Sequence, residues 1–473
     1  MRRLLRIFGE PVPAEIRATL ARARARVPER YRSARQWLGR SGAGCGATIG
    51  AMPRCDFACR GCYLGRGANR IPPLPVEAVK AQMRTLRPSL GDPGNLQLTD
   101  GEVLLRPTEE VTELLRYARE IGLMPMLMTH GDAFRRRPGL LERLIVEGGL
   151  EEVGIHVDTT QRGRFGAAFR DARREKALDP LRDELAGTIR AARRATKRPL
   201  RAAMTVTVTA ENLGGVAGIL RWLKRNADVF RIVSFQPLAA VGRTEPGLLG
   251  VAVEDLWREI AAGLLGPGAD SSGLAEGVVW MGHPKCNRIL PGLVARDGSA
   301  EPVFHPLRRD GDALDERVVD GFIERFGRLT FRGDSRSERI ARIAGAFAAA
   351  PGFALRSAPP YAARWLRRLA PGGRLRFLLR LLRGRASVSQ LTVVSHHFMS
   401  REEALSAEGR ERRELCVFRV AVDGRLVSMC EANALGVRER VYAEAAGSSA
   451  PGLGSCAEEG AETADRGLRV PAR

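Results

Sequence analysis

The sequence predicts an α/β protein, with a partial (β/α)6 barrel followed by a smaller α+β region. Six short apolar runs of β-forming residues recur between residues 45 and 238, and segments of helical periodicity separate most of them. This alternation is typical of parallel strands joined by right-handed helical crossovers. Six strands indicate an open, partial barrel rather than a closed barrel of eight, with the functional site at the carboxyl ends of the strands.

The elements of this barrel can be placed one by one. The strands are expected at residues 45–52, 95–100, 124–131, 152–158, 200–209 and 229–238. The helices between them are expected at residues 75–87, 107–122, 138–149, 180–196 and 211–227. Pro75 and Pro107 open two of these helices, at a position where the missing N–H of proline costs little. One more helix is expected at residues 253–265, and the alternation ends there.

Changes in composition divide the chain into six expected segments. They are a basic extension (1–43), the barrel domain (44–245), a connecting region that contains Cys286 (246–339), a basic amphipathic helical segment (340–385), an α+β region (386–442) and a tail (443–473). The tail is rich in small and polar residues and is expected to be disordered.

Charge and cysteine usage limit the class of protein. The 473 residues carry a formal net charge of +22, which favours an anionic partner, either nucleic acid or a membrane surface. Eight cysteines are too few for a disulfide scaffold of this length, so we expect metal or redox chemistry in a reducing compartment. The first 32 residues lack the apolar core of a secretory signal. We therefore expect a cytoplasmic protein, with peripheral contact to the inner face of the membrane as an option.

Three cysteines follow the first predicted strand with the spacing Cys-x3-Cys-x2-Cys, at Cys55, Cys59 and Cys62. A structural zinc site usually takes four ligands in two separated pairs, and no second pair follows at the right distance. A redox Cys-x2-Cys pair would leave Cys55 unexplained. An iron–sulfur cubane held by three cysteines keeps one iron open for a substrate or cofactor, which accounts for a set of three.

A cysteine triplet with this spacing, after the first strand of a β/α barrel, resembles the signature of the radical S-adenosylmethionine (radical SAM) enzymes. The resemblance implies that Cys55, Cys59 and Cys62 hold a 4Fe-4S cluster whose open iron binds SAM. It further implies reductive cleavage of SAM to a 5′-deoxyadenosyl radical, hydrogen abstraction from an unactivated C–H bond, and an electron donor such as a flavodoxin or ferredoxin. The family usually has an aromatic residue before the third cysteine; Gly61 stands there, and Tyr63 is the candidate substitute.

The strand ends supply candidate cofactor-binding residues. After the second strand, Asp100, Gly101 and Glu102 occupy the place of the family's Gly-Gly-Glu motif, which binds the SAM amino group; Glu102 offers an acceptor and Gly101 a close backbone approach. Alone, this motif would be an ordinary Asp-Gly turn. Further polar residues are expected at the ends of strands three to six: Thr129, His130, His156, Asp158, Thr207, Thr209, Asn212, Ser234 and Gln236. Of these, Thr129, Asp158 and Gln236 are predicted to bind the cofactor. A capping role remains the alternative for His130.

A second cysteine group is expected near the carboxyl terminus. Cys416 and Cys430 flank a predicted β-hairpin with its turn at Asp423-Gly424, so the two thiols can approach each other. With Cys286 they would provide three ligands for an auxiliary iron–sulfur cluster; the fourth would be His283, Cys45 or an exogenous group. The alternative for each is a small buried side chain. His396, His397 and Met399 are expected near this cluster or the substrate cavity, or else at a solvent-facing strand end.

Residues 45–442 resemble one branch of the superfamily, through the blocks around Gln236, Cys286, His396 and the late cysteine pair. This branch contains the archaeal tetraether-lipid synthases and their bacterial relatives, earlier discussed as class D radical methylases. The resemblance implies a hydrophobic, lipid-like substrate and C–C bond formation or alkyl modification. An RNA-modifying enzyme and a peptide maturase remain alternatives, as does a structural metal-binding protein without catalysis.

Residues 356–385 contain nine arginines and no acidic residue, and Leu375, Leu378, Leu379 and Leu382 follow helical spacing. A basic amphipathic helix of this kind suits an anionic membrane, where a lipid chain could enter the active site directly. Alternatively, its leucines pack on the protein's own core. RNA is the rival anionic partner, but we find no RNA-binding aromatic motif and only 5% aromatic residues, so nucleic acid is disfavoured.

Overall fold

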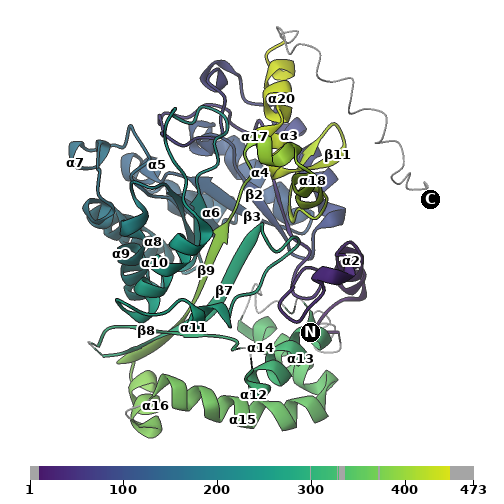
Figure 1. Ribbon diagram of the computed structural model, residues 1–473, viewed down its shortest axis with the longest axis vertical. Helices are drawn as coiled ribbons and strands as arrows, with labels where there is room; N and C mark the ends of the chain where they lie inside the picture. Colours follow the sequence, from purple (N-terminus) through teal and green to yellow (C-terminus); the bar gives the residue numbers. More distant parts are fainter. Residues whose placement is uncertain are drawn as a thin grey trace.

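The computed structural model describes residues 10–447 except 299, 310, 328, 330–335 and 371–372. Its centre is a curled sheet of 11 strands in the order β11-β10-β1-β2-β3-β4-β5-β6-β9-β7-β8 (Figure 1). In the described residues, no helix combines the length and apolar character needed to cross a membrane.

The six predicted strands form the middle of this sheet in sequence order. They are β1 (Cys45–Ala47), β2 (Gly94–Leu98), β3 (Leu123–Thr129), β4 (Glu152–His156), β5 (Arg201–Val208) and β6 (Phe230–Pro237). Each neighbouring pair is parallel. The predicted partial β/α barrel is therefore confirmed as a half-barrel.

The carboxyl-terminal region extends the same sheet at both sides. Strand β9 (Ala386–His396) lies parallel to β6, and β10 (Phe418–Val422) lies parallel to β1. Strand β7 (Asn287–Asp297) is antiparallel to β9 and to β8 (Val303–Pro306), and β11 (Arg425–Ser428) is antiparallel to β10. The strands expected in a smaller α+β region thus belong to the barrel sheet.

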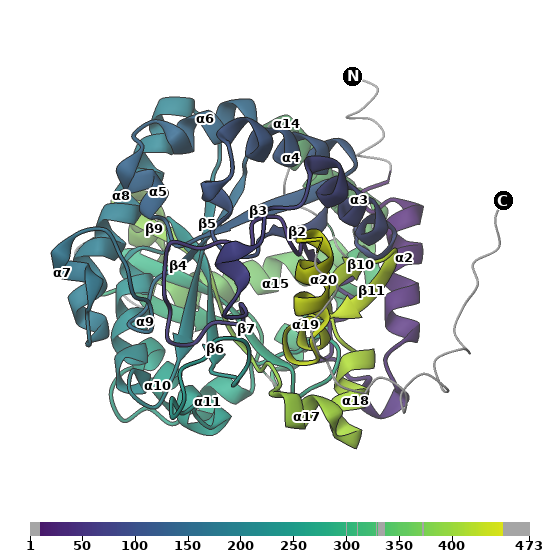
Figure 2. The same cartoon turned by 90° about the horizontal axis from the view of Figure 1, so that it is seen from above.

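Amphipathic helices cover the outside of the curled sheet, as the view from above shows (Figure 2). They are α3 (Val76–Leu86), α4 (Thr108–Glu120), α6 (Leu140–Glu147), α8 (Asp179–Thr196), α9 (Val216–Arg225) and α10 (Val253–Leu265). Their apolar faces and the strands share one large buried cluster, which includes Leu115, Leu144, Ile189, Leu220 and Phe235. Burial of these apolar stripes is the main force that holds the helices on the sheet.

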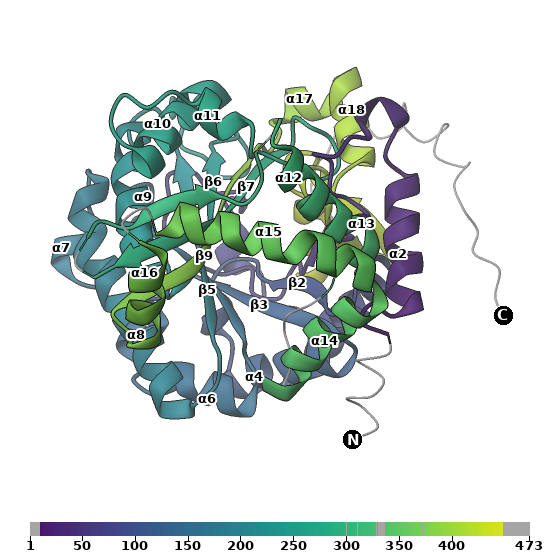
Figure 3. The same ribbon diagram turned by 90° about the horizontal axis from the view of Figure 1, so that it is seen from below.

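The remaining α-helices of the described residues fall into four sets. Helix α2 (Ala14–Ala25) lies beside β10, and α14 (Arg336–Ala349), α15 (Pro351–Leu369) and α16 (Arg374–Leu382) cover the face seen from below (Figure 3). The last group is α17 (Arg401–Leu405), α18 (Ala407–Glu414), α19 (Met429–Ala434) and α20 (Val437–Ala445). The short helices are α5 (Asp132–Arg136), α7 (Ala167–Arg170), α11 (Ser272–Ala275), α12 (Ala313–Asp315) and α13 (Gly321–Phe326). Most of the predicted tail, residues 448–473, lies outside the described residues.

Candidate active site

The cysteine loop between β1 and α3 lies across the carboxyl ends of the barrel strands. Loops that follow β4 and β6 hold it through backbone hydrogen bonds. The Ala58 N–H donates to the Arg162 carbonyl (3.1 Å), and the Arg243 N–H donates to the Cys62 and Leu64 carbonyls (3.0 and 2.8 Å). The Arg243 guanidinium also donates to the Phe57 carbonyl (2.9 Å). The path of the loop is therefore set by strands that are far away in the sequence.

The three loop thiols lie close enough to affect one another's pKa. Burial raises the pKa of Cys55 to about 12, and the neighbouring Cys62 thiol adds to the rise. Burial also raises the pKa of Cys59 far above its usual range, with contributions from Cys62 and Cys55. The Arg243 guanidinium opposes the rise at Cys59. Thiolates in this site therefore need a bound cation, and metal binding there must release protons.

The spacing of the loop sulfurs does not match a single ion. In the described residues, one trio of metal-capable side chains has all its ligand atoms within 4.8 Å of one another, namely Cys55, Asp56 and His130. The sulfurs of Cys55, Cys59 and Cys62 do not meet that limit. Zn–S bonds of 2.3 Å in a tetrahedral site would bring them to about 3.8 Å. A cubane, which offers a separate iron to each thiolate, fits the wider spacing.

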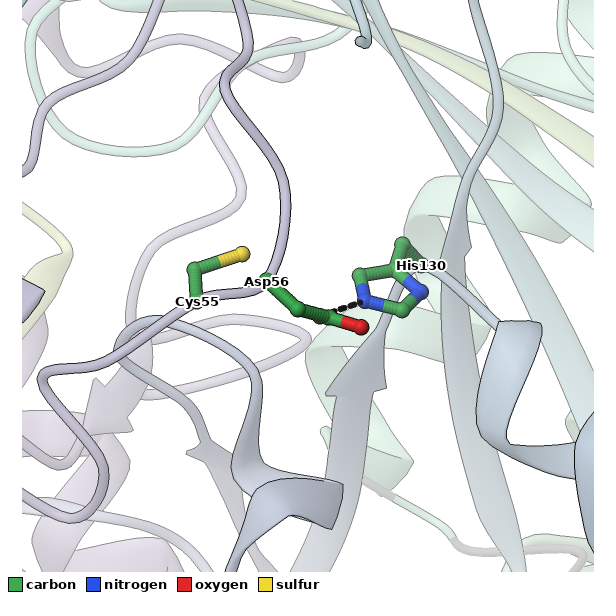
Figure 4. Close-up of side chains that lie close together, drawn as sticks. All are labelled: Cys55, Asp56 and His130. Carbon is green, nitrogen blue, oxygen red and sulfur yellow. Dashed lines mark hydrogen bonds and ion pairs between the residues drawn. The ribbon is translucent and has the colours of Figure 1, made fainter. Parts of the chain in front are cut away.

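Asp56 and His130 pair with each other beside Cys55 (Figure 4). His130 Nε2 lies 2.8 Å from the Asp56 carboxylate, and His130 Nδ1 accepts from the Asp132 N–H (3.2 Å). The imidazole also stacks on the Phe57 ring, with 3.7 Å between centroids. Both ring nitrogens of His130 therefore have hydrogen-bond partners, and the contacts with Asp56 and Phe57 fix the first residues of the cysteine loop.

The motif after β2 meets the cysteine loop through its backbone. The Gly101 N–H donates to the Met52 carbonyl (2.7 Å), and the Glu102 N–H donates to the Arg54 carbonyl (2.9 Å). A Cβ at position 101 would collide with the backbone of Arg54 and Pro53. Only glycine permits this close approach.

Glu102 points into the cavity and is almost fully buried. Its carboxylate accepts from Thr129 Oγ1 (2.8 Å), the His130 N–H (2.9 Å) and the Leu104 N–H (3.1 Å). These bonds hold the carboxylate at the cavity wall, where its negative charge suits a ligand ammonium. Thr129 thus orients Glu102 in addition to lining the cavity.

Asp100 occupies the place of the first glycine of that motif, and it forms a buried ion pair with Arg438 of α20. The Asp100 carboxylate also accepts from the Tyr442 hydroxyl (2.7 Å) and from the Gly50 N–H. The Arg438 guanidinium lies over the Tyr63 ring, 4.6 Å from its centroid. Asp100 therefore ties the end of β2 and the cysteine loop to the last helix of the described chain.

Gly61 differs from the aromatic residue expected before the third cysteine because Leu238 fills the space. A Cβ at position 61 would lie 2.5 Å from Leu238 Cδ1. Tyr63, the predicted substitute, lines the same cavity, and its hydroxyl donates to the Asp100 carbonyl. The apolar cover on this side of the loop is thus shared between Leu238 and Tyr63.

The remaining strand-end residues divide into two groups. Gln236, His156 and Thr207 line the cavity. Asp158 lies behind them, fully buried, and accepts from His156 Nε2 (2.5 Å), the Thr207 N–H (2.7 Å) and the Thr160 N–H (2.8 Å). The structure therefore places Asp158 as a support for His156. Asn212 is likewise buried and bonds Glu175 and the Thr207 carbonyl.

The second cysteine group lies in the gap between the two ends of the curled sheet. Cys286 precedes β7, while Cys416 and Cys430 flank the β10–β11 hairpin, whose turn residues Asp423 and Gly424 both have positive φ. Burial raises the pKa of Cys430 to about 12, and the neighbouring Cys416 and Cys286 contribute to the rise. Burial also raises the pKa of Cys286, and Cys416 adds to this. The structure thus brings these three distant cysteines together.

A buried arginine accompanies this group too. Arg412 of α18 contacts the Cys286 thiol, which partly offsets the rise in its pKa, and donates to the His397 carbonyl (2.7 Å). Both ring nitrogens of His283 are engaged, since Nδ1 accepts from the Lys285 N–H (3.2 Å) and Nε2 lies 3.3 Å from the Tyr31 hydroxyl. Burial lowers the pKa of His283 to about 4, so its imidazole is neutral at pH 7.

One cavity joins the two cysteine groups. Cys55, Cys59 and Cys62 line one end, and Cys430 lines the other. The cavity also has an apolar wall, formed by Leu238, Val241, Phe398, Met399, Phe418 and Met429. A substrate in this cavity would contact both sites.

Sequence reasoning missed four residues of the site. Arg243, Leu238, Arg412 and Arg438 were not predicted, although each contacts a cysteine, Gly61 of the cysteine loop or a residue of the strand-end motif. Arginine is abundant throughout this chain, so no single arginine stood out by composition. Half-buried Arg243 and buried Arg412 each lie next to a cysteine group, and this becomes visible only in the folded chain.

Comparison with known proteins gives distant relatives. A 7,8-dihydro-6-hydroxymethylpterin dimethyltransferase from Methanocaldococcus jannaschii is 24% identical over 202 residues, which are 42% of this chain. The chain spans 37% of that relative's length. Crystal structures of Streptococcus suis SuiB alone and bound to precursor peptide SuiA have 13% and 12% identity and TM-scores of 0.34 and 0.35. They cover 48% and 54% of this chain, and the matched parts are 47% and 51% of those chains.

A family model described as the radical SAM superfamily matches residues 49–223. The match begins just after β1, includes the cysteine loop and the Glu102 motif, and ends in α9. Residues 49–223 therefore belong to the radical SAM superfamily of enzymes.

Proposed function

We propose that this enzyme reductively cleaves SAM and abstracts a hydrogen atom from an unactivated C–H bond of a hydrophobic, lipid-like substrate. Cys55, Cys59 and Cys62 would hold the 4Fe-4S cluster, and the Glu102 carboxylate would accept a hydrogen bond from the SAM ammonium. The bound cluster would supply the electron for SAM cleavage. The observation that carries the proposal is the convergence of the three thiols and the Glu102 carboxylate on one buried cavity.

The chain's own residues would prepare this reaction. Arg243 offsets the negative charge of the thiolates, while Thr129 and the His130 N–H orient Glu102. Gly101 allows the strand-end backbone to approach the loop. Tyr63 and Leu238 exclude water around the loop, which protects a reactive radical from side reactions.

Cys286, Cys416 and Cys430 would hold an auxiliary iron–sulfur cluster beside the same cavity. Three thiols and the buried cation Arg412 repeat the arrangement of the first site. His283 is engaged with Tyr31 and Lys285, which favours an exogenous group as the fourth ligand. Iron and sulfide counts after anaerobic reconstitution test this cluster. We expect Cys430→Ala to lose about half of the iron and Cys45→Ala to lose none; equal iron in both variants would contradict it.

An acidic one-electron donor, such as a flavodoxin or ferredoxin, would dock over Cys59. Arg60, Arg66, Arg162 and Arg243 line an open hollow that Cys59 also lines. Glu245 lies there too and pairs with Arg60, so the arginines still outnumber the acid. Positive charge at this point attracts an acidic partner and shortens the path to the cluster. A stopped-flow assay with reduced flavodoxin measures the rate of electron transfer. We expect a lower rate for Arg66→Glu than for the wild type, with a larger difference at low salt, where charges are less screened.

The apolar wall formed by Leu238, Val241, Phe398, Met399, Phe418 and Met429 favours an alkyl substrate. C–C bond formation or alkyl modification would follow hydrogen abstraction. RNA and peptides are the alternative substrates.

Deuterium transfer distinguishes these substrates. Cells grown in deuterated medium provide a lipid extract, total RNA and a peptide digest, each of which is offered to the reconstituted enzyme with unlabelled SAM. Hydrogen abstraction places deuterium in 5′-deoxyadenosine, which mass spectrometry detects. We expect deuterium from the lipid extract. Transfer from RNA or peptides alone would overturn the lipid-like assignment while leaving the radical chemistry intact.

A further inference from the structure

Helices α15 and α16 form the face of the molecule opposite the cysteine loop (Figure 3). Helix α16 packs on the first residues of β9: its Phe377 is buried against Ala370 and Ala386. The cavity lies beyond the other end of β9, where Phe398 and Met399 line it. The exposed residues of α15 and α16 are called the basal face below.

The inner sides of both helices are already packed on the protein. Trp365 of α15 is buried, and Arg368 pairs with Asp315 of α12 (3.0 Å). The Tyr361 hydroxyl donates to the Leu307 carbonyl (3.4 Å). The opposite sides of these helices therefore make none of the packing contacts described above.

Those opposite sides carry large apolar residues. Leu382, Leu355 and Leu375 are the three most exposed large hydrophobic side chains of the described residues, at 82%, 76% and 72%. Leu375, Leu379 and Leu382 share one side of α16, while Leu355, Pro359 and Ala362 share one side of α15 and are all exposed. The alternative in which the leucines of α16 pack on the core is thus wrong for Leu375, Leu379 and Leu382.

Cations accompany this apolar face. Residues 356–385 contain nine arginines and no acidic residue. Arg364, Arg368 and Arg380 pair with Asp312, Asp315 and Asp297. The other six are exposed: Arg356, Arg367, Arg374, Arg376, Arg383 and Arg385. Exposed leucines surrounded by arginines are complementary to an anionic lipid surface. The leucines can insert at the boundary of the acyl chains, while the guanidinium groups bind the lipid phosphates.

We propose that the basal face binds the surface of an anionic lipid bilayer. This inference does not depend on the radical chemistry. Strand β9 has 11 residues, so about 33 Å separates the basal face from the carboxyl end of the strand. A bilayer on the basal face would therefore anchor the enzyme with its cavity turned away from the lipid. Direct entry of a lipid chain from that contact, as the sequence suggested, does not fit this geometry.

Vesicle flotation with the full-length protein tests the proposal. We expect binding to vesicles of equimolar phosphatidylglycerol and phosphatidylcholine, on the order of tenfold or more tighter than to pure phosphatidylcholine, and weaker binding as salt rises from about 0.05 M to about 0.5 M. Leu375→Gln/Leu382→Gln should weaken binding about tenfold or more. The matched control Leu249→Gln/Leu265→Gln changes two exposed leucines elsewhere and should leave binding within about twofold.

Arginine substitutions test the contribution of charge to vesicle binding. Arg376→Gln/Arg383→Gln should weaken binding on the order of tenfold, and the control Arg170→Gln/Arg194→Gln, with the same change in net charge, should weaken it far less. Far-UV circular dichroism checks folding of each variant, and Leu355→Gln replaces the leucine pair if that variant is unfolded. SAM cleavage should be unchanged in all of them.

Three results would overturn the proposal. The first is no binding of the wild type to anionic vesicles. The second is equal vesicle binding by the leucine variant and its control. The third is preference for single-stranded RNA, lost in the arginine variant and kept in the leucine variant, which would identify nucleic acid as the partner.

Discussion

Single side chains decide how the cysteine loop is held. In this chain Asp100 replaces a glycine of the strand-end motif, and its charge is matched by Arg438, more than 300 residues later in the sequence. Both side chains are buried, and Tyr63 and Tyr442 surround them. Removal of one partner from such a pair leaves an uncompensated charge in the interior.

We predict that Arg438→Met lowers the free energy of unfolding by about 3–5 kcal/mol in urea titrations. Arg440→Met is the matched control on the same helix, because Arg440 pairs with Asp423 in a half-exposed position and should cost at most about 1 kcal/mol. Asp100→Gly/Arg438→Met removes both charges and should recover part of the loss. Equal costs for the two single variants would show that the buried pair does not stabilise the loop.

His396 predicts a pH dependence of stability. Burial lowers its pKa to about 4, and the unfolded chain has a histidine pKa of about 6.5. The neutral imidazole is therefore favoured in the folded state, so its contribution is complete above pH 6.5 and is lost as the pH falls toward 4. This costs about 2 kcal/mol between pH 7.5 and 5. Urea titrations at both pH values measure the fall in the free energy of unfolding from pH 7.5 to 5. We expect this fall to be smaller by that amount in His396→Gln than in the wild type, and an equal fall in both proteins would contradict the prediction.

For individual site residues, the sequence predicted the place along a strand better than the direction in which the side chain points. The place of Glu102 at a strand end followed from its distance after the triplet, and the structure puts its carboxylate in the cavity. Asp158 has the same local pattern, yet its carboxylate faces Thr160 and Thr207 inside the protein. Alternation along a strand does not fix which polar residue faces the cavity when a tight turn follows.

Short elements position the second cysteine group. Cys430 is the second residue of α19, whose capping box joins Ser428 and Glu431. Helix α17 has the same kind of capping box, formed by Ser400 and Glu403, and contains no cysteine. The orientation of Cys430 therefore depends on the start of α19.

We predict that Ser428→Ala costs about 1–2 kcal/mol of stability and lowers the iron retained by the auxiliary cluster. Ser400→Ala removes the equivalent hydrogen bond from α17 and should leave the iron content unchanged. Iron and sulfide are measured after anaerobic reconstitution and gel filtration. Similar iron loss in both variants would mean that general destabilisation, rather than the position of Cys430, controls the cluster.

Local pattern was sufficient to locate most barrel elements. Residues 253–265 were predicted as a helix and form α10, and β2 to β6 begin and end within two residues of the expected ranges. The neighbours of the outer strands were not predictable, because β9 beside β6 and β10 beside β1 are pairings across long stretches of chain. Strand β7 was missed, since it follows an irregular segment and contains Pro291 and Gly292.

In the whole molecule, the carboxyl-terminal strands close part of the gap that a half-barrel leaves open. The second cysteine group lies at this closure, the Asp100–Glu102 motif lies at the strand ends, and one cavity joins them. The net charge of +22 has at least two local concentrations, the arginines around Cys59 and those of the basal face. Composition predicted an anionic partner, while the fold separates these two concentrations of positive charge, which we propose to bind an electron donor and a lipid surface.

The formation of 5′-deoxyadenosine from SAM by the anaerobically reconstituted, dithionite-reduced protein tests the central claim most directly. Cys59→Ala removes one cluster ligand, and Cys416→Ala is a matched control in the other cysteine group. We expect product from the wild type and from Cys416→Ala, and none from Cys59→Ala. No product from the wild type, or equal product from wild type and Cys59→Ala, would contradict it.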